Sequence, residues 1–291
     1  MEWLSGYAVF HWIATWSNPS CDILFRVVTD LGQATFYYLA VAPLFWVVDR
    51  RKATVLFLMI VAGAYVNTYA KLWVNTPRPD PALVRVLDLR PYLSHSNSFP
   101  SGHAQGAVVF WGCLAWWVGR SWFTALALAL IGLISFSRLY LGVHFPIDIA
   151  GGWVLGALML PLIRPFQRWV KSDCYTPVWG MLAIAAGTLA STLTGDAARA
   201  MISGSTIGFL AAAGWLPQQP FATTSARQST VVVVLGLAMQ LGLSATLGLV
   251  APSSLLSYYG LTAFLWVFAL WIYPRSVAAA WLRLAPARLQ S

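Results

Sequence analysis

The chain has 291 residues, of which 59% are hydrophobic and 9% are charged, and its formal net charge is +9. Soluble globular chains carry about a quarter charged residues, so this composition excludes a domain that faces water on all sides. The basic residues lie in short clusters between apolar stretches and form no single patch, which argues against nucleic acid as a partner.

The apolar stretches predict membrane-spanning helices. Stretches of about 18 to 22 residues recur along the chain, which is long enough to cross a hydrocarbon core of about 30 Å. Their apolar runs are continuous and not alternating, which favours helices over the strands of a closed barrel. We expect helices, in chain order, over residues 31–48, 53–74, 101–119, 122–140, 147–163, 175–194, 201–216, 229–249 and 253–273. The expected fold class is therefore all-α, a polytopic transmembrane helix bundle of about nine helices.

Residues 1–20, in the segment 1–30 that precedes these helices, have an acid at Glu2 and no basic region. A cleavable signal peptide would begin with positive charge. Because the segment is rich in Trp and Phe with a few polar breaks, we expect it to lie along the membrane interface.

The charges between the helices predict the orientation of the chain. If the loop after the first helix is cytoplasmic, eleven basic residues fall on the inner side and six on the outer side, which favours an outer N-terminus and an inner C-terminus. The inner residues are Arg50, Arg51, Lys52, Arg120, Arg164, Arg168, Lys171, Arg227, Arg275, Arg283 and Arg288, and the outer ones are Lys71, Arg78, Arg85, Arg90, Arg138 and Arg199, while Arg26, near the first helix, is assigned to neither side.

Polar residues that are far apart in the chain are expected to meet on the outer face. The ends of even-numbered helices and the starts of odd-numbered helices share one side of the membrane, so helices two to five bring their polar ends together. The residues at these ends are Lys71, Arg78, Ser101, Gly102, His103, Arg138, His144 and Asp148. The sequence therefore predicts one site at the membrane boundary.

The cations Lys71, Arg78 and Arg138 predict that this site binds phosphate. A group of cations near the membrane boundary is costly unless an anion occupies it. The fork of an arginine matches phosphate oxygens, and a lysine adds a point charge. In Pro100-Ser101-Gly102-His103, the proline favours a helix start and the glycine lets a ligand approach the N–H groups of the first turn.

Two histidines, His103 and His144, predict a reaction on that phosphate. Splitting a phosphoester needs a nucleophile and an acid that protonates the leaving oxygen. Asp148 follows His144 by one helical turn, where its carboxylate can fix the imidazole tautomer. We therefore assign His144 as the nucleophile, oriented by Asp148, and His103 as the general acid. The cations supply charge neutralisation, so magnesium is not required.

Other polar residues have simpler explanations. Neither an Asp/Glu/His cluster nor a Cys spacing indicates a metal site, so no metal and no cofactor is expected. His95 lies in a run of Ser and Asn and is interpreted as a solvated loop residue. Gly152 and Gly156, four residues apart in the fifth helix, predict close packing against another helix.

The site residues fall into three ordered runs, Lys71-Leu-Trp-Val-Asn-Thr-Pro-Arg78-Pro79, Pro100-Ser101-Gly102-His103 and Ser137-Arg138-Leu-Tyr-Leu-Gly-Val-His144-Phe-Pro-Ile-Asp148. Their order and spacing resemble the three signature motifs of the type 2 phosphatidic acid phosphatase (PAP2) superfamily. The resemblance implies a PAP2/haloperoxidase-like core, a phosphohistidine intermediate on His144 and protonation of the leaving group by His103. It also implies phosphate binding by Lys71, Arg78, Ser101, Gly102 and Arg138.

The resemblance divides the chain into three parts: an interfacial segment over 1–30, a PAP2-like catalytic core over 31–172 and additional transmembrane helices over 173–291. The common bacterial members of the family end soon after the helix that follows the third motif, whereas about 120 residues follow it here. Nine helices with an outer N-terminus resemble the layout of glucose-6-phosphatase and, loosely, of sphingosine-1-phosphate phosphatases.

These observations favour a metal-independent membrane phosphatase that acts on a lipid phosphate or pyrophosphate, of isoprenyl, glycerolipid or sphingoid type. Its active site is expected on the outer, periplasmic or lumenal, face of an inner or plasma membrane. A soluble sugar phosphate is the alternative substrate. A non-catalytic lipid-binding or transport protein is a further alternative, against which the intact pair of histidines argues. Haloperoxidase activity is disfavoured by the transmembrane scaffold.

Overall fold

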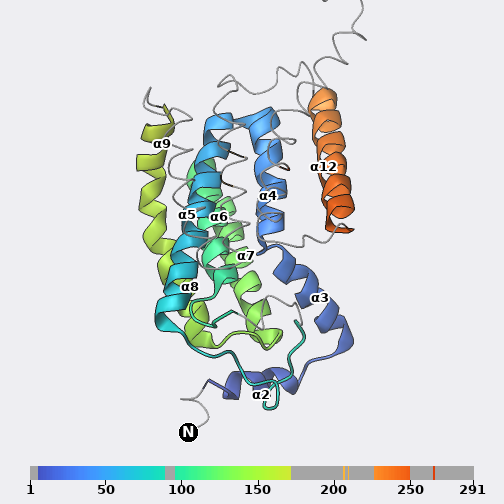
Figure 1. Ribbon diagram of the computed structural model, residues 1–291, viewed down its shortest axis with the longest axis vertical. Helices are drawn as coiled ribbons and strands as arrows, with labels where there is room; N and C mark the ends of the chain where they lie inside the picture. Colours follow the sequence, from blue (N-terminus) through green and yellow to red (C-terminus); the bar gives the residue numbers. More distant parts are fainter. Residues whose placement is uncertain are drawn as a thin grey trace, which may run out of the picture. The chain divides into compact units, whose positions relative to one another are not determined.

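The computed structural model describes residues 6–88, 96–171 and 226–249, together with the single residues 206, 209 and 265 (Figure 1). Every regular element in these ranges is a helix, in agreement with the expected all-α class. The chain forms two compact units. One comprises Met1–Tyr38 and Leu56–Pro165, and the other comprises Leu39–Val55 and Phe166–Ser291.

The first unit is built around α6 (Gly102–Val118), α7 (Ser121–Tyr140) and α8 (Pro146–Met159), and α6 packs against both of its neighbours (Figure 1). Two glycines on α8 face α6. A Cβ at Gly152 would lie 2.6 Å from the Ser101 carbonyl oxygen, and a Cβ at Gly156 would lie 2.7 Å from Cβ of Val108. The glycines therefore let the two helix backbones approach closely, as their spacing predicted.

Local signals fix where these helices begin and end. The Ser101 hydroxyl accepts a hydrogen bond from the Ala104 N–H at 3.4 Å at the start of α6, and Gly119 ends that helix with a φ of +62°. Pro146 lies in the first turn of α8, where its missing N–H breaks no hydrogen bond. Because both helix starts carry motif residues, these signals also set the position of the predicted site.

The N-terminal part of the chain contains α2 (Ala8–Ala14), α3 (Pro19–Asp30), α4 (Ala34–Pro43) and a π-helical turn, η1 (Leu44–Val48). The helix expected over 31–48 corresponds to α4 and η1, which begin three residues later, and α3, in the segment expected to lie along the interface, meets them at a bend of 54°. Gly32 lies at this bend, and a Cβ there would be 2.6 Å from Cγ2 of Ile134 on α7. The bend therefore lets α7 approach a position where only glycine fits.

Three helical segments among the described residues are long and apolar enough to cross a membrane. They are α5 (Arg50–Val74), α7, and the segment Pro146–Lys171, which joins α8, η3 (Leu160–Leu162) and α9 (Ile163–Lys171). The bent segment from Pro19 to Val48 would be a fourth. These segments support an integral membrane protein.

The helix expected over 229–249 corresponds to α12 (Ala226–Leu249). Those expected over 175–194, 201–216 and 253–273 lie outside the described residues, apart from the helical residues 206, 209 and 265. The count of nine helices and the division at residues 30 and 172 therefore stay predictions.

Candidate active site

The loop that follows α5 is anchored to the end of that helix. Nζ of Lys71 donates hydrogen bonds to the carbonyl oxygens of Asn97 at 2.5 Å and Ser98 at 3.0 Å. The Asn97 amide donates back to the Lys71 carbonyl oxygen at 2.8 Å, and the Ser98 N–H donates to the carbonyl oxygen of Thr76 at 2.9 Å. The first motif and the segment before the second motif are thus one connected structure.

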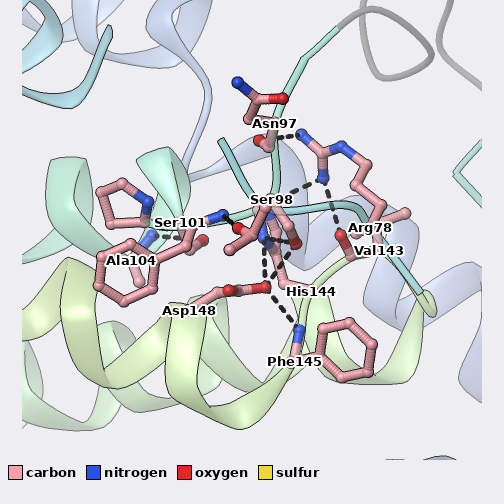
Figure 2. Close-up of polar contacts among 12 residues, drawn as sticks. Arg78, Asn97, Ser98, Ser101, Ala104, Val143, His144, Phe145 and Asp148 are labelled. Carbon is pink, nitrogen blue, oxygen red and sulfur yellow. Dashed lines mark hydrogen bonds and ion pairs between the residues drawn. The ribbon is translucent and has the colours of Figure 1, made fainter. Parts of the chain in front are cut away.

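Arg78 extends from this loop to the turn before α8 (Figure 2). Its Nη1 atom donates to the Val143 carbonyl oxygen at 2.7 Å and lies 3.2 Å from Nε2 of His144. Its Nε atom donates to the Ser96 carbonyl oxygen at 2.8 Å. The guanidinium therefore lies beside Nε2 of the histidine, where its fork can hold the oxygens of a phosphate.

The other ring nitrogen of His144 faces Asp148. Nδ1 lies 3.3 Å from Oδ2 of the carboxylate. The same oxygen accepts hydrogen bonds from the Phe145 N–H at 2.8 Å and from the Ser98 hydroxyl at 2.5 Å (Figure 2). Because a carboxylate accepts, this geometry favours the tautomer with its proton on Nδ1. The lone pair is then on Nε2, beside Arg78.

His144 is buried, with 2% of its surface exposed. Burial lowers the pKa of His144 well below its ordinary value of 6.5, and the positive charges of Arg78, Arg138 and Lys71 lower this pKa further, whereas Asp88 raises it. The imidazole is therefore neutral at neutral pH, which is the form that a nucleophile requires.

Arg138 is completely buried and reaches two partners that the sequence did not indicate. Its Nη1 atom donates to Thr29 Oγ1 at 2.6 Å and to Asp88 Oδ2 at 3.0 Å. Its carbonyl oxygen accepts from the Val143 N–H at 3.2 Å, next to the contact that Arg78 makes. The two arginines are thus connected through one residue of the turn before α8.

The residues that open α6 lie beside the His144–Asp148 pair. The Ser101 N–H donates to the Asp148 carbonyl oxygen at 2.9 Å. A Cβ at Gly102 would lie 3.2 Å from Oδ1 of Asn67, so glycine relieves crowding there. Cδ2 of His103 is 3.0 Å from the position that a Cβ of Gly32 would take. The His103 ring therefore lies at the break between α3 and α4.

The structure thus joins Lys71, Arg78, Ser101, His144 and Asp148 through contacts with one another or with residues 96–98 and 143. Sequence reasoning missed Ser98, Asp88 and Thr29. Ser98 belongs to the same Ser- and Asn-rich run as His95 and was assigned no role, although its position directly before Phe99-Pro100 was a signal that it borders the second motif. His95, in the same run, lies outside the described residues. Within the described ranges, no group of three or more His, Cys, Asp or Glu residues could hold a metal ion.

Comparison with known proteins supports the class of this site. Residues 52–172 match the family model of the PAP2 superfamily. Phosphatidylglycerophosphatase B of Bacillus subtilis (strain 168) is 28% identical over 162 residues, which cover 52% of this chain and 70% of that protein. Lipid phosphate phosphatase delta of Arabidopsis thaliana is 30% identical over 158 residues, which cover 50% of this chain and 38% of that protein.

A solved structure supports the fold. The crystal structure of a transmembrane PAP2 type phosphatidylglycerolphosphate phosphatase from Bacillus subtilis superposes with a TM-score of 0.50 at 23% identity, covering 58% of this chain and 87% of that one. Sphingosine-1-phosphate phosphatase 2 of Homo sapiens is a further relative, 29% identical over 157 residues, which cover 52% of this chain and 38% of that protein. The chain therefore matches less than half the length of the Arabidopsis and human relatives.

The fold and the site define an integral membrane protein with a cationic site, built around a buried histidine, at the ends of its helices. Residues 52–172 match the PAP2 superfamily model, so the resemblance inferred from the three motifs is confirmed. The relatives named above are phosphatases by name, in agreement with the enzyme class that the motifs predicted.

Proposed function

We propose that this protein is a metal-independent phosphatase that hydrolyses a phosphate monoester or diphosphate of a membrane lipid through a phosphohistidine on His144. The observation that carries the proposal is the pairing of His144, whose Nδ1 faces Asp148 at 3.3 Å while its Nε2 lies 3.2 Å from Arg78. The Nε2 atom proposed as the nucleophile is therefore next to Arg78, the cation proposed to bind the phosphate.

The first step transfers the phosphoryl group to the enzyme. Nε2 of His144 attacks phosphorus, and the bond from phosphorus to the leaving oxygen breaks as His103 gives its proton to that oxygen. The phosphorylated ring becomes cationic and is stabilised by Asp148. Arg78, Lys71 and Arg138 neutralise the charge of the phosphoryl oxygens, which is the main requirement of this reaction.

The second step releases the phosphate. A water molecule attacks phosphorus and gives its proton to His103, while the bond from phosphorus to Nε2 breaks. Inorganic phosphate leaves, His144 is again neutral and His103 is again protonated. Ser101 and Gly102 support both steps, because the N–H groups of a first helical turn favour an anion.

A lipid substrate is supported by the membrane-spanning segments beside the site and by the relatives, whose names refer to phosphatidylglycerophosphate, lipid phosphate and sphingosine-1-phosphate. We also propose that the site opens to the outer, periplasmic or lumenal, face of an inner or plasma membrane. The excess of basic residues in the opposite set of loops supports this orientation.

The test is phosphate release by the purified protein in detergent micelles. We expect turnover of at least one of phosphatidylglycerol phosphate, sphingosine 1-phosphate and undecaprenyl diphosphate, undiminished by EDTA, with a higher kcat/KM than for glucose 6-phosphate. His144→Ala should abolish turnover and covalent phosphate labelling, whereas His11→Ala, which removes an exposed histidine of α2, should behave as wild type. Equal or faster turnover of glucose 6-phosphate would replace the lipid substrate by a sugar phosphate.

A further inference from the structure

The two partners of Arg138 Nη1 come from outside the three motifs. Asp88 lies 50 residues before Arg138, in the loop after α5, and Thr29 lies 109 residues before it, on α3. The Arg138 side chain is 0% exposed and the Asp88 side chain is 4% exposed, so water does not screen their ion pair. The structure therefore contains a buried acid within the cationic site.

A buried ion pair of this kind fixes geometry more than it adds stability. Desolvation of both charges offsets most of their attraction, but loss of one partner leaves the other charge buried and unbalanced. The planar guanidinium of an arginine takes its direction from such hydrogen bonds. The Asp88 carboxylate thus neutralises Arg138 and sets the direction of its guanidinium.

The segment that carries Asp88 is itself held in place. The Leu87 N–H donates to the Leu141 carbonyl oxygen at 3.0 Å, immediately before Asp88. Three residues before Asp88, Nη1 of Arg85 donates to Oδ1 of Asp22 at 3.0 Å, and its Nη2 donates to the other carboxylate oxygen. Gly142 has a φ of +73°, and a side chain there would collide with the Arg85 carbonyl oxygen. These contacts therefore hold Asp88 in position beside Arg138.

We infer that Asp88 is a positioning residue, which holds Arg138 in the direction needed to bind the substrate phosphate and limits the positive charge around His144. The inference rests on the proposed function, because it assigns a role within the same site. Asp88 does not touch the reacting atoms, and it acts through Arg138.

The charge of Asp88 also affects the pKa of His144. The charged groups that act on His144 are the cations Arg78, Arg138 and Lys71 and the acids Asp88 and Asp148. The negative charge of Asp88 raises the pKa of His144 and so opposes the cations. Removal of that charge should lower this pKa further, which moves the acid limb of the pH profile of kcat/KM to lower pH.

The experiment compares three variants with the wild type. Asp88→Asn removes the charge with almost no change of shape, and Thr29→Val removes the other partner of Arg138 without changing any charge. Asp80→Asn is the matched control, because Asp80 is an exposed acid in the same loop whose carboxylate accepts a hydrogen bond from the Ala82 N–H. Thermal unfolding in detergent would show that each variant is folded. Asp88→Ser, which is smaller and also uncharged, takes the place of Asp88→Asn if that variant does not fold.

We expect Asp88→Asn to lower kcat/KM by about tenfold or more, since misplacement of a binding group by about 1 Å costs up to about 100-fold. Its acid limb should move to lower pH, because the negative charge that raises the pKa of His144 is removed. Thr29→Val should lower kcat/KM without moving the limb, and Asp80→Asn should change neither quantity.

The outcomes separate the inference from the proposed function. An active wild type, together with an Asp88→Asn variant that matches Asp80→Asn in both kcat/KM and pH profile, would overturn the role of Asp88 alone. A loss of kcat/KM without movement of the acid limb would overturn its electrostatic part. A wild type that releases no phosphate from any substrate would overturn the proposed function, and this inference with it.

Discussion

The two halves of the candidate site are built in different ways. The helix-start half, residues 101–103 and 144–148, lies at the beginnings of α6 and α8, and its main contacts are a serine cap, a first-turn proline and a pair of residues four apart. The loop half, residues 71–88 and 96–98, depends on contacts between residues far apart in the chain, such as Arg78 with Val143, 65 residues away.

The difference shows which parts of the site are held by contacts close in the chain and which depend on contacts between distant residues. In the helix-start half, one helical turn places Asp148 near His144, and the loop half adds the Ser98 hydroxyl to this pair. The loop half positions Lys71 and Arg78, which are proposed to bind phosphate, and its geometry depends on tertiary contacts. Changes in the loop half should therefore reduce catalysis while leaving the helix bundle folded, whereas changes where α6 packs on α8 should reduce stability.

Apart from loss of His144 itself, the largest effect is expected at Ser98, where the two halves meet. Its hydroxyl donates to Oδ2 of Asp148 at 2.5 Å and lies 3.4 Å from Nδ1 of His144. Ser98→Ala should lower kcat by about ten- to a hundredfold with a smaller change in KM, because it disturbs the orientation of the nucleophile. Steady-state kinetics would measure this, with Ser17→Ala, a serine hydroxyl near α2, as the control. An unchanged kcat would mean that the helix-start half needs no support from the loop.

The pH profile of kcat/KM tests whether burial and the neighbouring cations keep His144 neutral. Burial and the neighbouring cations lower the pKa of His144 below its ordinary value of 6.5, so the free enzyme should keep a neutral nucleophile down to pH values below 6.5. The acid limb of kcat/KM should therefore lie below pH 6.5, after correction for the titration of the substrate phosphate near about pH 6. An acid limb at or above pH 6.5 would contradict the buried setting.

The lowered pKa of His144 also makes the stability of the protein depend on pH. The unfolded chain binds a proton on His144 at about pH 6.5, whereas the folded chain does so only at lower pH. Stability should therefore fall as the pH drops below about 6.5, and His144→Gln should weaken this dependence.

A smaller effect, on stability, is expected where α8 packs on α6. A Cβ at Gly152 would lie 2.6 Å from the Ser101 carbonyl oxygen, whereas a Cβ at Gly132 on α7 would meet nothing within 4 Å. Gly152→Ala should destabilise the protein by about 1 to 3 kcal/mol, as overpacking does, while Gly132→Ala should not. Thermal unfolding in detergent would compare them. Equal melting temperatures would show that the helix-start half does not depend on this close packing.

The smallest effect is expected at the outer anchor of the loop half. The side chains of Arg85 and Asp22 are 47% and 15% exposed, and partly exposed pairs contribute about 1 kcal/mol or less. Asp22→Asn should therefore lower kcat/KM by only a few fold, and the difference should shrink at high salt. A loss as large as that expected for Asp88→Asn would show that the outer anchor controls the whole loop.

The sequence by itself determined the parts of this protein that depend on local periodicity and spacing. Apolar windows located α5, α6, α7 and α8 to within a few residues, and the alternation of helix direction brought the motif residues to one face. The spacing of four placed Asp148 beside His144, and the spacing of Gly152 and Gly156 identified the close helix contact. Each of these follows from the geometry of a helix, which is the same in every chain.

Only the tertiary structure decided which partners the cations and the carboxylate take. Asp88 and Thr29 bind Arg138 across 50 and 109 residues, and Ser98 binds Asp148 across 50. The helix break at residues 31–33, where Gly32 meets Ile134 and His103, also depends on tertiary packing. Polar loops have no periodicity that links them to a distant helix, so their contacts arise when packing brings the helices together and closes the loop between them.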